Sequence, residues 1–403
     1  MNPPTRVADV QDRKRILFVD DEPQVLSGFK RMLYPMRDEW AAFFAVGAAD
    51  ALDFLSREPA DLVVSDLRMP GINGVEFLSA VKTRWPRTIR FVLSGCADRF
   101  MILRCAGPAH QFLSKPCDAE SLVKAIRRAF SLRERVRSIP VLRFAESCSH
   151  LPPMPGLYAM LASALDSPDS TLDSICGVLE RDAVLASKML RLVTSAFFGY
   201  VDSIRQAASY LGAEAMGAVA LASSLFDQYL GGPDEFGLAE CLDHSTSVGA
   251  VSGRWILRAS RDRKAAEEAT MSGLLHDVGK LVFARNRPDD TRRVAPLAAA
   301  RSIPLHAAER EIFGVSHAEI GAYLLDEWGV ADNVVEAVAF HHRPSDAHVR
   351  EPNSLFAVHA ANALCHKRAD PGGRWETLLD VPFLSAVDPA WSIDAFDAAS
   401  EQS

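Results

Sequence analysis

Residues 62–71 read Leu-Val-Val-Ser-Asp-Leu-Arg-Met-Pro-Gly, and this stretch decides the fold of the first part of the chain. A run of apolar, β-branched residues that ends in the carboxylate of Asp66, with Pro70 and Gly71 just beyond, predicts a buried parallel strand with an acid at its C-terminal end. In open α/β sheets, ligands bind at the edge formed by the carboxyl ends of the strands. Many strands end in an aspartate at a turn, so Asp66 alone does not define a site.

Other apolar runs of the same segment also end in polar residues. Each run reads as a short strand, and the carboxyl ends of parallel strands meet at one edge of a sheet. The polar residues that follow these runs are Asp20, Asp21, Ser94 and Lys115, and Pro116 comes directly after the lysine. The sequence therefore predicts that carboxylates, a hydroxyl and an amine meet around Asp66.

Carboxylates that converge at a sheet edge repel one another unless a cation lies between them, and oxygen ligands favour Mg²⁺. A lysine and a serine beside the same point supply the charge and the hydrogen bond that a transferred phosphoryl group needs. An aspartate can also act as the nucleophile and form an aspartyl phosphate. We therefore expect Asp66 to accept a phosphoryl group. The alternative is that the acids cap helices and turns and that Lys115 lies on the surface.

The segment resembles the receiver domain of two-component response regulators over residues 14–132, on the motifs VDDEP, SDLRMPGINGVEFL, LSGCAD and HQFLSKP. The resemblance implies a doubly wound parallel sheet of five strands with helices on both faces. It also implies that a histidine kinase or a phosphotransfer protein phosphorylates Asp66. By position, it further implies a Mg²⁺ site formed by Asp20, Asp21, Asp66 and the backbone carbonyl of Arg68, a switch formed by Ser94, Lys115 and Phe112, and a loop shaped by Pro116.

The length and composition indicate how many domains the chain can form and in which environment. With 403 residues, 48% of them hydrophobic, the chain is long enough for two domains with their own cores. We expect neither a membrane-spanning helix nor a signal peptide, since no apolar stretch has the required length. The seven cysteines are scattered and odd in number, which is typical of free thiols in a reducing cytoplasm.

The charge is distributed unevenly. The net charge is −8, and the acidic excess lies after residue 137, so we expect no direct DNA binding by that part. A basic cluster falls on the helix that is predicted to leave the first domain. We interpret it as the solvated face of a linker helix rather than a nucleic-acid patch. Its residues are Arg127, Arg128, Arg133, Arg135 and Arg137.

A domain boundary is predicted between residues 138 and 155, where a helical pattern ends and prolines follow. We assign residues 133–150 to a linker helix and a proline-rich boundary. From residue 151 to residue 403, apolar residues recur at helical spacing almost throughout, which predicts an all-α domain.

The all-α domain places histidines and acids where they suggest a metal site. The residues concerned are Glu240, His244, His276, Asp277, Lys280, His317, His341, His342 and Asn362. Imidazole and carboxylate ligands from several helices can build a mono- or dinuclear site for an iron-, manganese- or zinc-type metal. Such a site can activate water against a phosphoester. The alternative is that these residues are buried or capping groups.

This domain resembles the HDOD domain, an all-helical relative of the HD metal-dependent phosphohydrolases, on residues 151–155, 182–199 and 203–212. The resemblance covers about residues 148–345, with a weaker tail to residue 403. It implies a signalling or protein-interaction module without an established catalytic activity, and a downstream signalling protein as its partner. A receiver domain followed by an HDOD domain is a familiar arrangement in bacterial response regulators.

A further resemblance is to the HD-GYP phosphodiesterases, whose metal-site or catalytic positions fall on Glu240, His244, His276, Asp277, Lys280, His317, His341 and His342. Two departures stand against hydrolysis. Asn362 takes the place of a carboxylate ligand, and the residues after His342, Arg-Pro-Ser-Asp, contain no GYP-type loop. Lys280 is the residue expected to be catalytic if the site is active.

Two main functions are therefore expected. In the first, the chain is a cytoplasmic two-component response regulator: phosphorylation of Asp66 draws Ser94 inward, Phe112 repacks, and the HDOD domain changes its contacts. In the second, the receiver gates a metal-dependent phosphohydrolase that acts on cyclic dinucleotides or nucleotides. Nucleotide binding without cleavage is a third expectation. A signalling role without enzymatic activity is favoured over catalysis, and a homodimer is a further expectation.

Overall fold

The computed structural model describes residues 13–95, 109–152, 176–177, 179, 203–211, 213–229, 236–347, 349 and 351–401. The motif expected at residues 182–199 lies outside the described residues. The chain divides into two compact units, and the boundary between them falls between Ala129 and Phe130. Among the described residues, no helix is both long enough and apolar enough to span a membrane.

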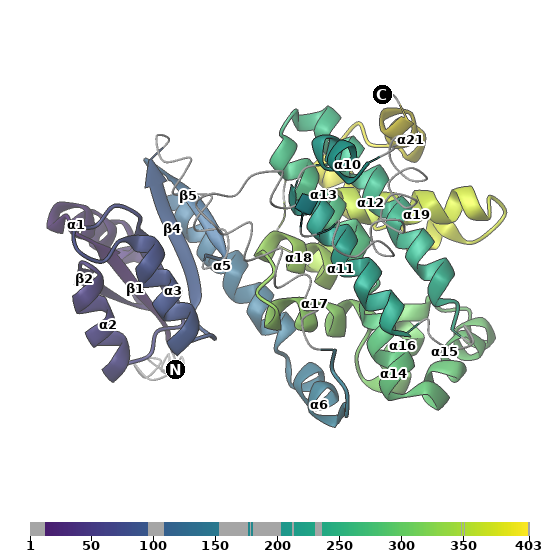
Figure 1. Cartoon of the computed structure of the whole chain (residues 1–403), viewed down its shortest axis with the longest axis horizontal. Helices are drawn as coiled ribbons and strands as arrows, with labels where there is room; N and C mark the ends of the chain where they lie inside the picture. Colours follow the sequence, from purple (N-terminus) through teal and green to yellow (C-terminus); the bar gives the residue numbers. More distant parts are fainter. Residues whose placement is uncertain are drawn as a thin grey trace, which may run out of the picture. The chain divides into compact units, whose positions relative to one another are not determined.

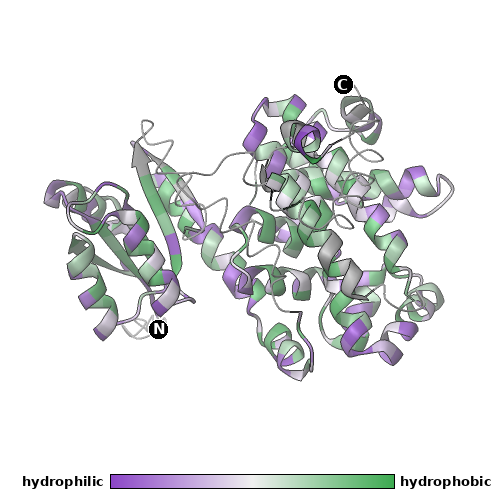
Figure 2. Ribbon diagram, in the orientation of Figure 1, coloured by the Kyte–Doolittle hydropathy of each residue, from purple (hydrophilic) through white to green (hydrophobic). Residues whose placement is uncertain are grey.

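The first unit is built on a parallel sheet of five strands in the order β2-β1-β3-β4-β5 (Figure 1). The strands are β1 (Lys14–Asp20), β2 (Trp40–Val46), β3 (Leu62–Asp66), β4 (Ile89–Gly95) and β5 (Gln111–Lys115). Every residue of β3 is buried, as expected for a central strand covered on both faces. Figure 2 shows the strands as hydrophobic over most of their length.

Helices cover both faces of this sheet. The helices are α1 (Pro23–Met32), α2 (Ala48–Arg57), α3 (Gly74–Arg84) and α5 (Ala119–Val136), and a short 3-10 turn η2 (Tyr34–Met36) follows α1. Alternate residues of β1 serve the two faces: Leu17 and Val19 pack in the core that α2 and α3 cover, whereas the ring of Phe18 stacks on Phe29 of α1 at a centroid distance of 5.2 Å. The predicted doubly wound receiver fold is confirmed.

Helix α5 begins in the first unit and ends in the second. Its last turns contribute Leu132 and Val136 to the core of the second unit, and α6 (Ile139–Ser147) contributes Phe144 to the same core. The segment 133–150, which we expected to contain a linker helix and a proline-rich boundary, is helical over most of its length and packs into the core of the second unit. The prediction that its arginines form a solvated face is wrong for Arg133, whose side chain is 12% exposed.

The second unit is helical in all its described parts. Its helices after α6 are α10 (Ile204–Leu211), α11 (Ala213–Tyr229), α12 (Leu238–Ser260), α13 (Arg263–Leu275), α14 (Gly279–Asn286), α15 (Pro288–Arg301), α16 (Leu305–Phe313), α17 (His317–Glu327), α18 (Asp332–Phe340), α19 (Ser354–Ala369), α20 (Val381–Val387) and α21 (Ile393–Glu401). Two 3-10 turns, η4 (Pro344–Asp346) and η5 (Trp375–Leu378), flank α19.

One hydrophobic core runs through the second unit and reaches as far as Phe383 of α20 and Phe396 of α21. The tail after residue 379, over which the resemblance to the HDOD domain was weaker, is therefore part of this core. Trp255 of α12 stacks on Phe396 at 5.2 Å and lies 5.0 Å from Phe356 of α19. The C-terminal helix α21 thus packs on the long helix α12, which in turn packs on α19.

Candidate functional site

The first candidate site lies at the carboxyl edge of the sheet. The register of β1 and β3 pairs Val19 with Ser65, so Asp20 and Asp66, the next residues, end neighbouring strands. Lys115 ends β5 and reaches both acids. Its Nζ donates to Asp20 Oδ2 at 2.9 Å and also makes a hydrogen bond to Asp66 Oδ1. The strand ends therefore bring together the acids and the amine that the sequence predicted.

Backbone groups hold the two acids in place. The Arg68 N–H donates to Asp66 Oδ2 at 2.7 Å, and the Glu22 N–H donates to Asp20 Oδ1 at 2.9 Å. Gly74 begins α3 directly against Asp66, and a Cβ at this position would overlap the backbone of that aspartate. The loop after Asp66 therefore depends on a residue without a side chain.

The charges of this edge favour an ionised lysine. Burial lowers the pKa of Lys115, but its hydrogen bonds to Asp66 and Asp20 and their negative charges outweigh burial, so the pKa is raised. In the structure this ammonium group offsets part of the negative charge of the two buried acids. The carboxylate oxygens are the donor type that Mg²⁺ prefers, so the residues fit a magnesium ion.

The other predicted residues of this site lie in or directly after strands β1, β4 and β5. Asp21 is partly buried and follows β1 directly, and Pro116 follows β5 after a cis peptide bond. Ser94 lies near the end of β4, and Phe112 lies within β5. The side chains of both residues are outside the described part of the structure.

The second candidate site is a cluster of histidines and one aspartate inside the helical unit. Two sets of side chains bring possible ligand atoms within 4.8 Å of one another: His317, His341 and His342 form one set, and His244, His276 and Asp277 form the other. Asp277 links the sets, because its Oδ1 lies 3.1 Å from His317 Nε2 and its Oδ2 lies 3.5 Å from His276 Nε2.

The ends of helices deliver these residues. His276 caps the C-terminus of α13, His341 caps the C-terminus of α18, and His317 is the first residue of α17. Gly279, the first residue of α14, lies so close to His317 that a Cβ there would overlap the histidine carbonyl. This close approach allows residues of different helices to meet at one point.

The histidine rings are oriented by their Nδ1 atoms. The Nδ1 of His276 lies 2.7 Å from the Gly273 carbonyl, and the Nδ1 of His341 lies 2.8 Å from the Val338 carbonyl. A carbonyl can only accept, so each Nδ1 carries the proton, and Nε2 is left with its lone pair. The Nε2 of His276 is buried and has no hydrogen-bond partner among the described residues.

The Nε2 atoms of His341 and His342 approach His317. Its Nε2 lies 3.0 Å from His342 Nε2 and 3.4 Å from His341 Nε2. Imidazole nitrogens at such distances need either a shared proton or a cation between them, because facing lone pairs repel. A second carboxylate, Glu309 of α16, accepts from His317 Nδ1 at 2.7 Å. A carboxylate behind a histidine is the usual support of a metal-binding imidazole.

The ionisation of the cluster follows from burial and from its two acids. Burial lowers the pKa of His276 to about 3 and holds the pKa of His341 and of His342 well below its usual value. Burial also lowers the pKa of His317, but Glu309 and Asp277 outweigh it and raise this pKa to about 9. A proton on His317 is thus the alternative to a metal ion among these nitrogens.

Three further predicted residues, Glu240, Asn362 and Lys280, are not members of the two ligand sets. Glu240, in the first turn of α12, is exposed and belongs to neither ligand set. Asn362 of α19 lies beside the cluster, and its Oδ1 forms a hydrogen bond of 3.0 Å with His244 Nε2. This bond occupies the nitrogen of a predicted metal ligand. Lys280 donates to Asp277 Oδ2 at 2.6 Å.

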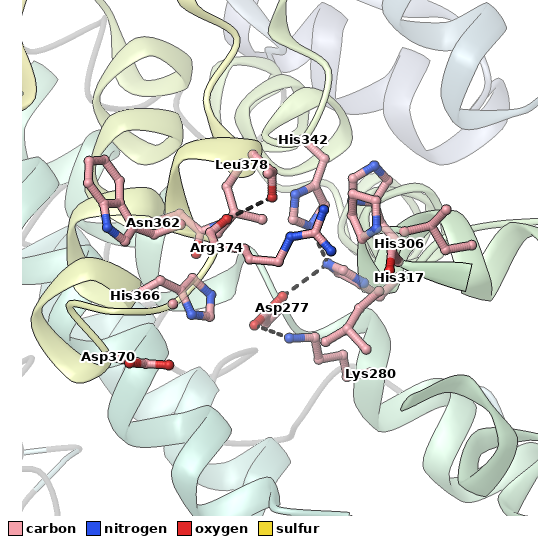
Figure 3. A pocket seen from close by; sticks show the side chains of 17 residues that line it. Asp277, Lys280, His306, His317, His342, Asn362, His366, Asp370, Arg374 and Leu378 are labelled. Atoms are coloured by element: carbon pink, nitrogen blue, oxygen red, sulfur yellow. Dashed lines mark hydrogen bonds and ion pairs between the residues drawn. The ribbon is translucent and has the colours of Figure 1, made fainter. Parts of the chain in front are cut away.

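A cavity of about 330 Å³ opens beside the cluster (Figure 3). Asp277, Lys280 and His317 line it, and the segment after α19 contributes Arg374. Figure 3 shows the side chains of Arg374 and His342 among those that line the cavity. Sequence reasoning missed several residues of this region because no motif marks them. They are His306, Glu309, His359, His366 and Arg374.

The donor set of the cluster fits a metal ion. Imidazole and carboxylate groups suit iron, manganese and zinc, and the buried Nε2 of His276, which makes no hydrogen bond among the described residues, offers a ligand atom. The ion pair between Lys280 and Asp277 and the bond between His244 and Asn362 compete with such an ion. The two ligand sets therefore fit a metal ion that is bound mainly by histidines, with Asp277 as their only carboxylate among the described residues.

Comparison with protein families assigns both units. The response regulator receiver domain matches residues 16–127, and the HDOD domain matches residues 151–344. The chain is also similar to the hydrogenase transcriptional regulatory protein HoxA of Cupriavidus necator, with 32% identity over 188 residues. That alignment spans 42% of this chain and 36% of the relative, so the chain spans well under two thirds of its length.

Two solved structures share the helical fold. One is an HDOD domain protein of unknown function from Geobacter sulfurreducens, with 21% identity, a TM-score of 0.51, and coverage of 68% of this chain and 93% of that one. The other is a phosphohydrolase candidate from Shewanella amazonensis, with 23% identity, a TM-score of 0.51, and coverage of 66% and 94%. At these identities the likeness concerns the fold alone.

Proposed function

The chain is a response regulator receiver domain joined to an HDOD domain, and on this premise we propose that phosphorylation of Asp66 controls the helical HDOD unit. The observation that carries the proposal is the position of Lys115, whose Nζ pairs with both Asp20 and Asp66 at the carboxyl edge of the sheet. An ammonium group in this position can contact an oxygen of a phosphoryl group on Asp66.

In the proposed reaction, a carboxylate oxygen of Asp66 attacks the phosphorus atom of the donor. The bond between phosphorus and the donor breaks, and its electron pair leaves with the donor. A Mg²⁺ ion would be held by Asp20, Asp21, Asp66 and the Arg68 carbonyl, and it supplies neutralisation of the oxygen charges. Lys115 and the hydroxyl of Ser94 bind the transferred oxygens, Phe112 repacks as the third switch residue, and Pro116 shapes the loop after Lys115.

The test is phosphorylation of the full chain by acetyl phosphate with Mg²⁺, followed on a phosphate-affinity gel. Asp66→Asn keeps the shape of the side chain but removes the nucleophile, so we expect no shifted band. Asp53→Asn is the matched control, because Asp53 is an exposed aspartate of the same unit that pairs with Arg57. A shifted band of equal intensity in Asp66→Asn would contradict the proposal.

The proposed partners follow from this role. A histidine kinase or a phosphotransfer protein supplies the phosphoryl group in the cytoplasm, and a downstream signalling protein binds the HDOD unit. Neither DNA nor a membrane is a proposed partner, since the second half of the chain carries the acidic excess and offers no basic stripe.

For the helical unit, the proposal is a signalling module that holds an iron-, manganese- or zinc-type ion among its histidines. The support is the approach of the Nε2 atoms of His341 and His342 to the Nε2 of His317, which itself lies 3.1 Å from Asp277 Oδ1. Hydrolysis is not part of this proposal, because Asn362 binds His244 where a carboxylate ligand would be needed. Among the predicted residues, Glu240 is the one for which the geometry offers no role.

Metal analysis of the purified full chain tests this part independently. We expect a bound ion in wild type and its loss in His276→Gln, which removes the buried unpartnered nitrogen. His150→Gln is the control, since that ring is exposed. A wild-type protein that folds but retains no metal after growth in metal-supplemented medium would contradict the metal centre and leave the phosphorylation proposal intact.

A further inference from the structure

The last turns of α5 are held on the helical unit by three arginines at alternate positions. Arg133 pairs with Asp326 Oδ1 and with Asp332 Oδ1, each at 2.7 Å. Arg137 pairs with Asp326 Oδ2 and with Glu327 Oε1, each at 2.8 Å. Asp326 lies at the end of α17 and Asp332 begins α18, so these two arginines anchor α5 at the junction of those helices.

Arg135, between these anchors, contacts the opposite ends of the same two helices. Its Nε lies 3.4 Å from Glu319 Oε1 in the first turn of α17. Its guanidinium also lies over the ring of Phe340, the last residue of α18, at 5.7 Å from the ring centroid. A weaker ion pair at 3.7 Å joins it to Asp346. One side chain of α5 thus contacts the two helix ends that carry cluster histidines.

Glu319 connects Arg135 to His317. The other oxygen of Glu319 accepts from the N–H and the hydroxyl of Ser316, each at 2.9 Å, which is one half of a capping box. His317 follows Ser316 as the first residue of α17. On α18, Phe340 directly precedes His341. A shift of Arg135 would therefore reach His317 through Glu319 and Ser316, and His341 through Phe340.

Glu319 is shared between two cations. Arg310 of α16 donates to its Oε2 at 3.1 Å, while Arg135 approaches its Oε1. Glu319 is buried, and a buried carboxylate responds strongly to the loss or movement of a partner because little water replaces it. Arg310 belongs to the helix that also carries Glu309, the support of His317. The capping carboxylate is thus held from α16 on one side and from α5 on the other.

We infer that Arg135 is a positioning residue that couples α5 to the histidine cluster, so that the phosphorylation state of the receiver reaches His317 and His341 through Glu319 and Phe340. The inference rests on the proposed function, because it requires a receiver that responds at Asp66. Covalent continuity supports the route: α5 starts in the receiver and its residues from Phe130 onward belong to the helical unit.

The test uses the full chain with Mg²⁺ and beryllium fluoride, a phosphoryl mimic whose binding is followed by fluorine NMR. Hydrogen exchange is measured for peptides that cover residues 316–320, the start of α17, with and without the mimic. In wild type we expect the mimic to change these exchange rates by about threefold or more, the size of a modest coupling between sites. This readout does not require a metal ion in the histidine cluster.

Variants separate coupling from structure. Arg135→Gln and Glu319→Gln are both expected to abolish the change, while peptides of α5 keep their protection because Arg133 and Arg137 still anchor the helix. Arg135→Lys keeps the charge but not the planar fork and should retain part of the change. Arg301→Gln is the control, since this exposed arginine pairs with Glu311 elsewhere in the same unit.

The outcomes are distinct. A response in Arg135→Gln as large as in wild type would overturn the inference, and so would the lack of any change in wild type that has demonstrably bound the mimic. Failure of the wild type to bind the mimic at all would remove the proposed function and the inference with it. Binding that is absent only in Asp66→Asn, together with a response lost in both glutamine variants, is the result we expect.

Discussion

Glu309 accepts hydrogen bonds from both the backbone N–H of His317, at 2.8 Å, and the ring Nδ1 of the same histidine, at 2.7 Å. Both groups are buried. One carboxylate thus fixes the start of α17 and the orientation of its first side chain together. The Nε2 of His317 is thereby directed at Asp277 and at the other histidines of the cluster.

Removal of the Glu309 charge should weaken metal binding. Glu309→Gln keeps an acceptor for His317 but removes the negative charge that makes its imidazole a stronger ligand, and loss of such a support typically costs about 10- to 100-fold in affinity. Titration with cobalt(II), followed by its visible absorption, measures the change. Glu311→Gln, on the exposed side of the same helix, is the control. Equal affinities in all three proteins would contradict this role.

Gly74 should not tolerate a side chain. A Cβ there would overlap the backbone of Asp66 and Leu67, so Gly74→Ala is expected to lower the free energy of unfolding of the receiver by about 1–3 kcal/mol, the usual cost of overpacking. Gly28→Ala in α1 is the matched control, because its Cβ meets open space, and alanine is the better helix former. Urea denaturation followed by tryptophan fluorescence compares the two. A stable Gly74→Ala variant would refute the close packing.

Acid should destabilise the helical unit in the absence of metal. Burial lowers the pKa of His276 to about 3 and of His306 and His366 to about 4. In the unfolded chain these rings take up a proton near pH 6.5, whereas in the folded chain they do not. Stability is therefore present above that pH and is lost as the pH falls toward the folded pKa values, by up to about 1.4 kcal/mol per pH unit for the fully buried His276.

Thermal unfolding in a chelating buffer, followed by far-UV circular dichroism at pH 7.5 and pH 5.5, measures this loss. We expect a lower midpoint at pH 5.5 in wild type and a smaller difference in His276→Gln. His150→Gln removes an exposed ring and should behave as wild type does. A midpoint that does not change between the two pH values would show that the buried rings are already protonated in the folded state.

The receiver site was predictable because its geometry follows from the backbone. Parallel strands place their carboxyl ends at one edge, so the order of polar residues along the chain was enough to bring Asp20, Asp66 and Lys115 together. The helical site was predictable only in part. His276, Asp277, His317, His341 and His342 do converge, but the exposed Glu240 remains outside, because its place in the sequence does not tell which way its side of the helix faces.

The residues that sequence reasoning missed are joined by packing alone. Glu309 reaches His317 from a separate helix, and no spacing rule connects them. Arg133 was expected to be solvated, yet its partner Asp332 lies 199 residues away in the sequence. A charged helix face has the same sequence pattern whether it faces water or an acidic surface from a distant part of the chain. The ion pairs of α5 could therefore be identified only from the structure.

The position of the phosphoryl group is the most direct test of the account. The full chain is phosphorylated with acetyl phosphate and Mg²⁺, reduced with borohydride, which converts an aspartyl phosphate to homoserine, and mapped by peptide mass spectrometry. We predict homoserine at position 66 and at no other aspartate of the receiver edge. Conversion at Asp20 or Asp21 instead, or no conversion in protein that binds Mg²⁺, would contradict the assignment of Asp66 as the input of this protein.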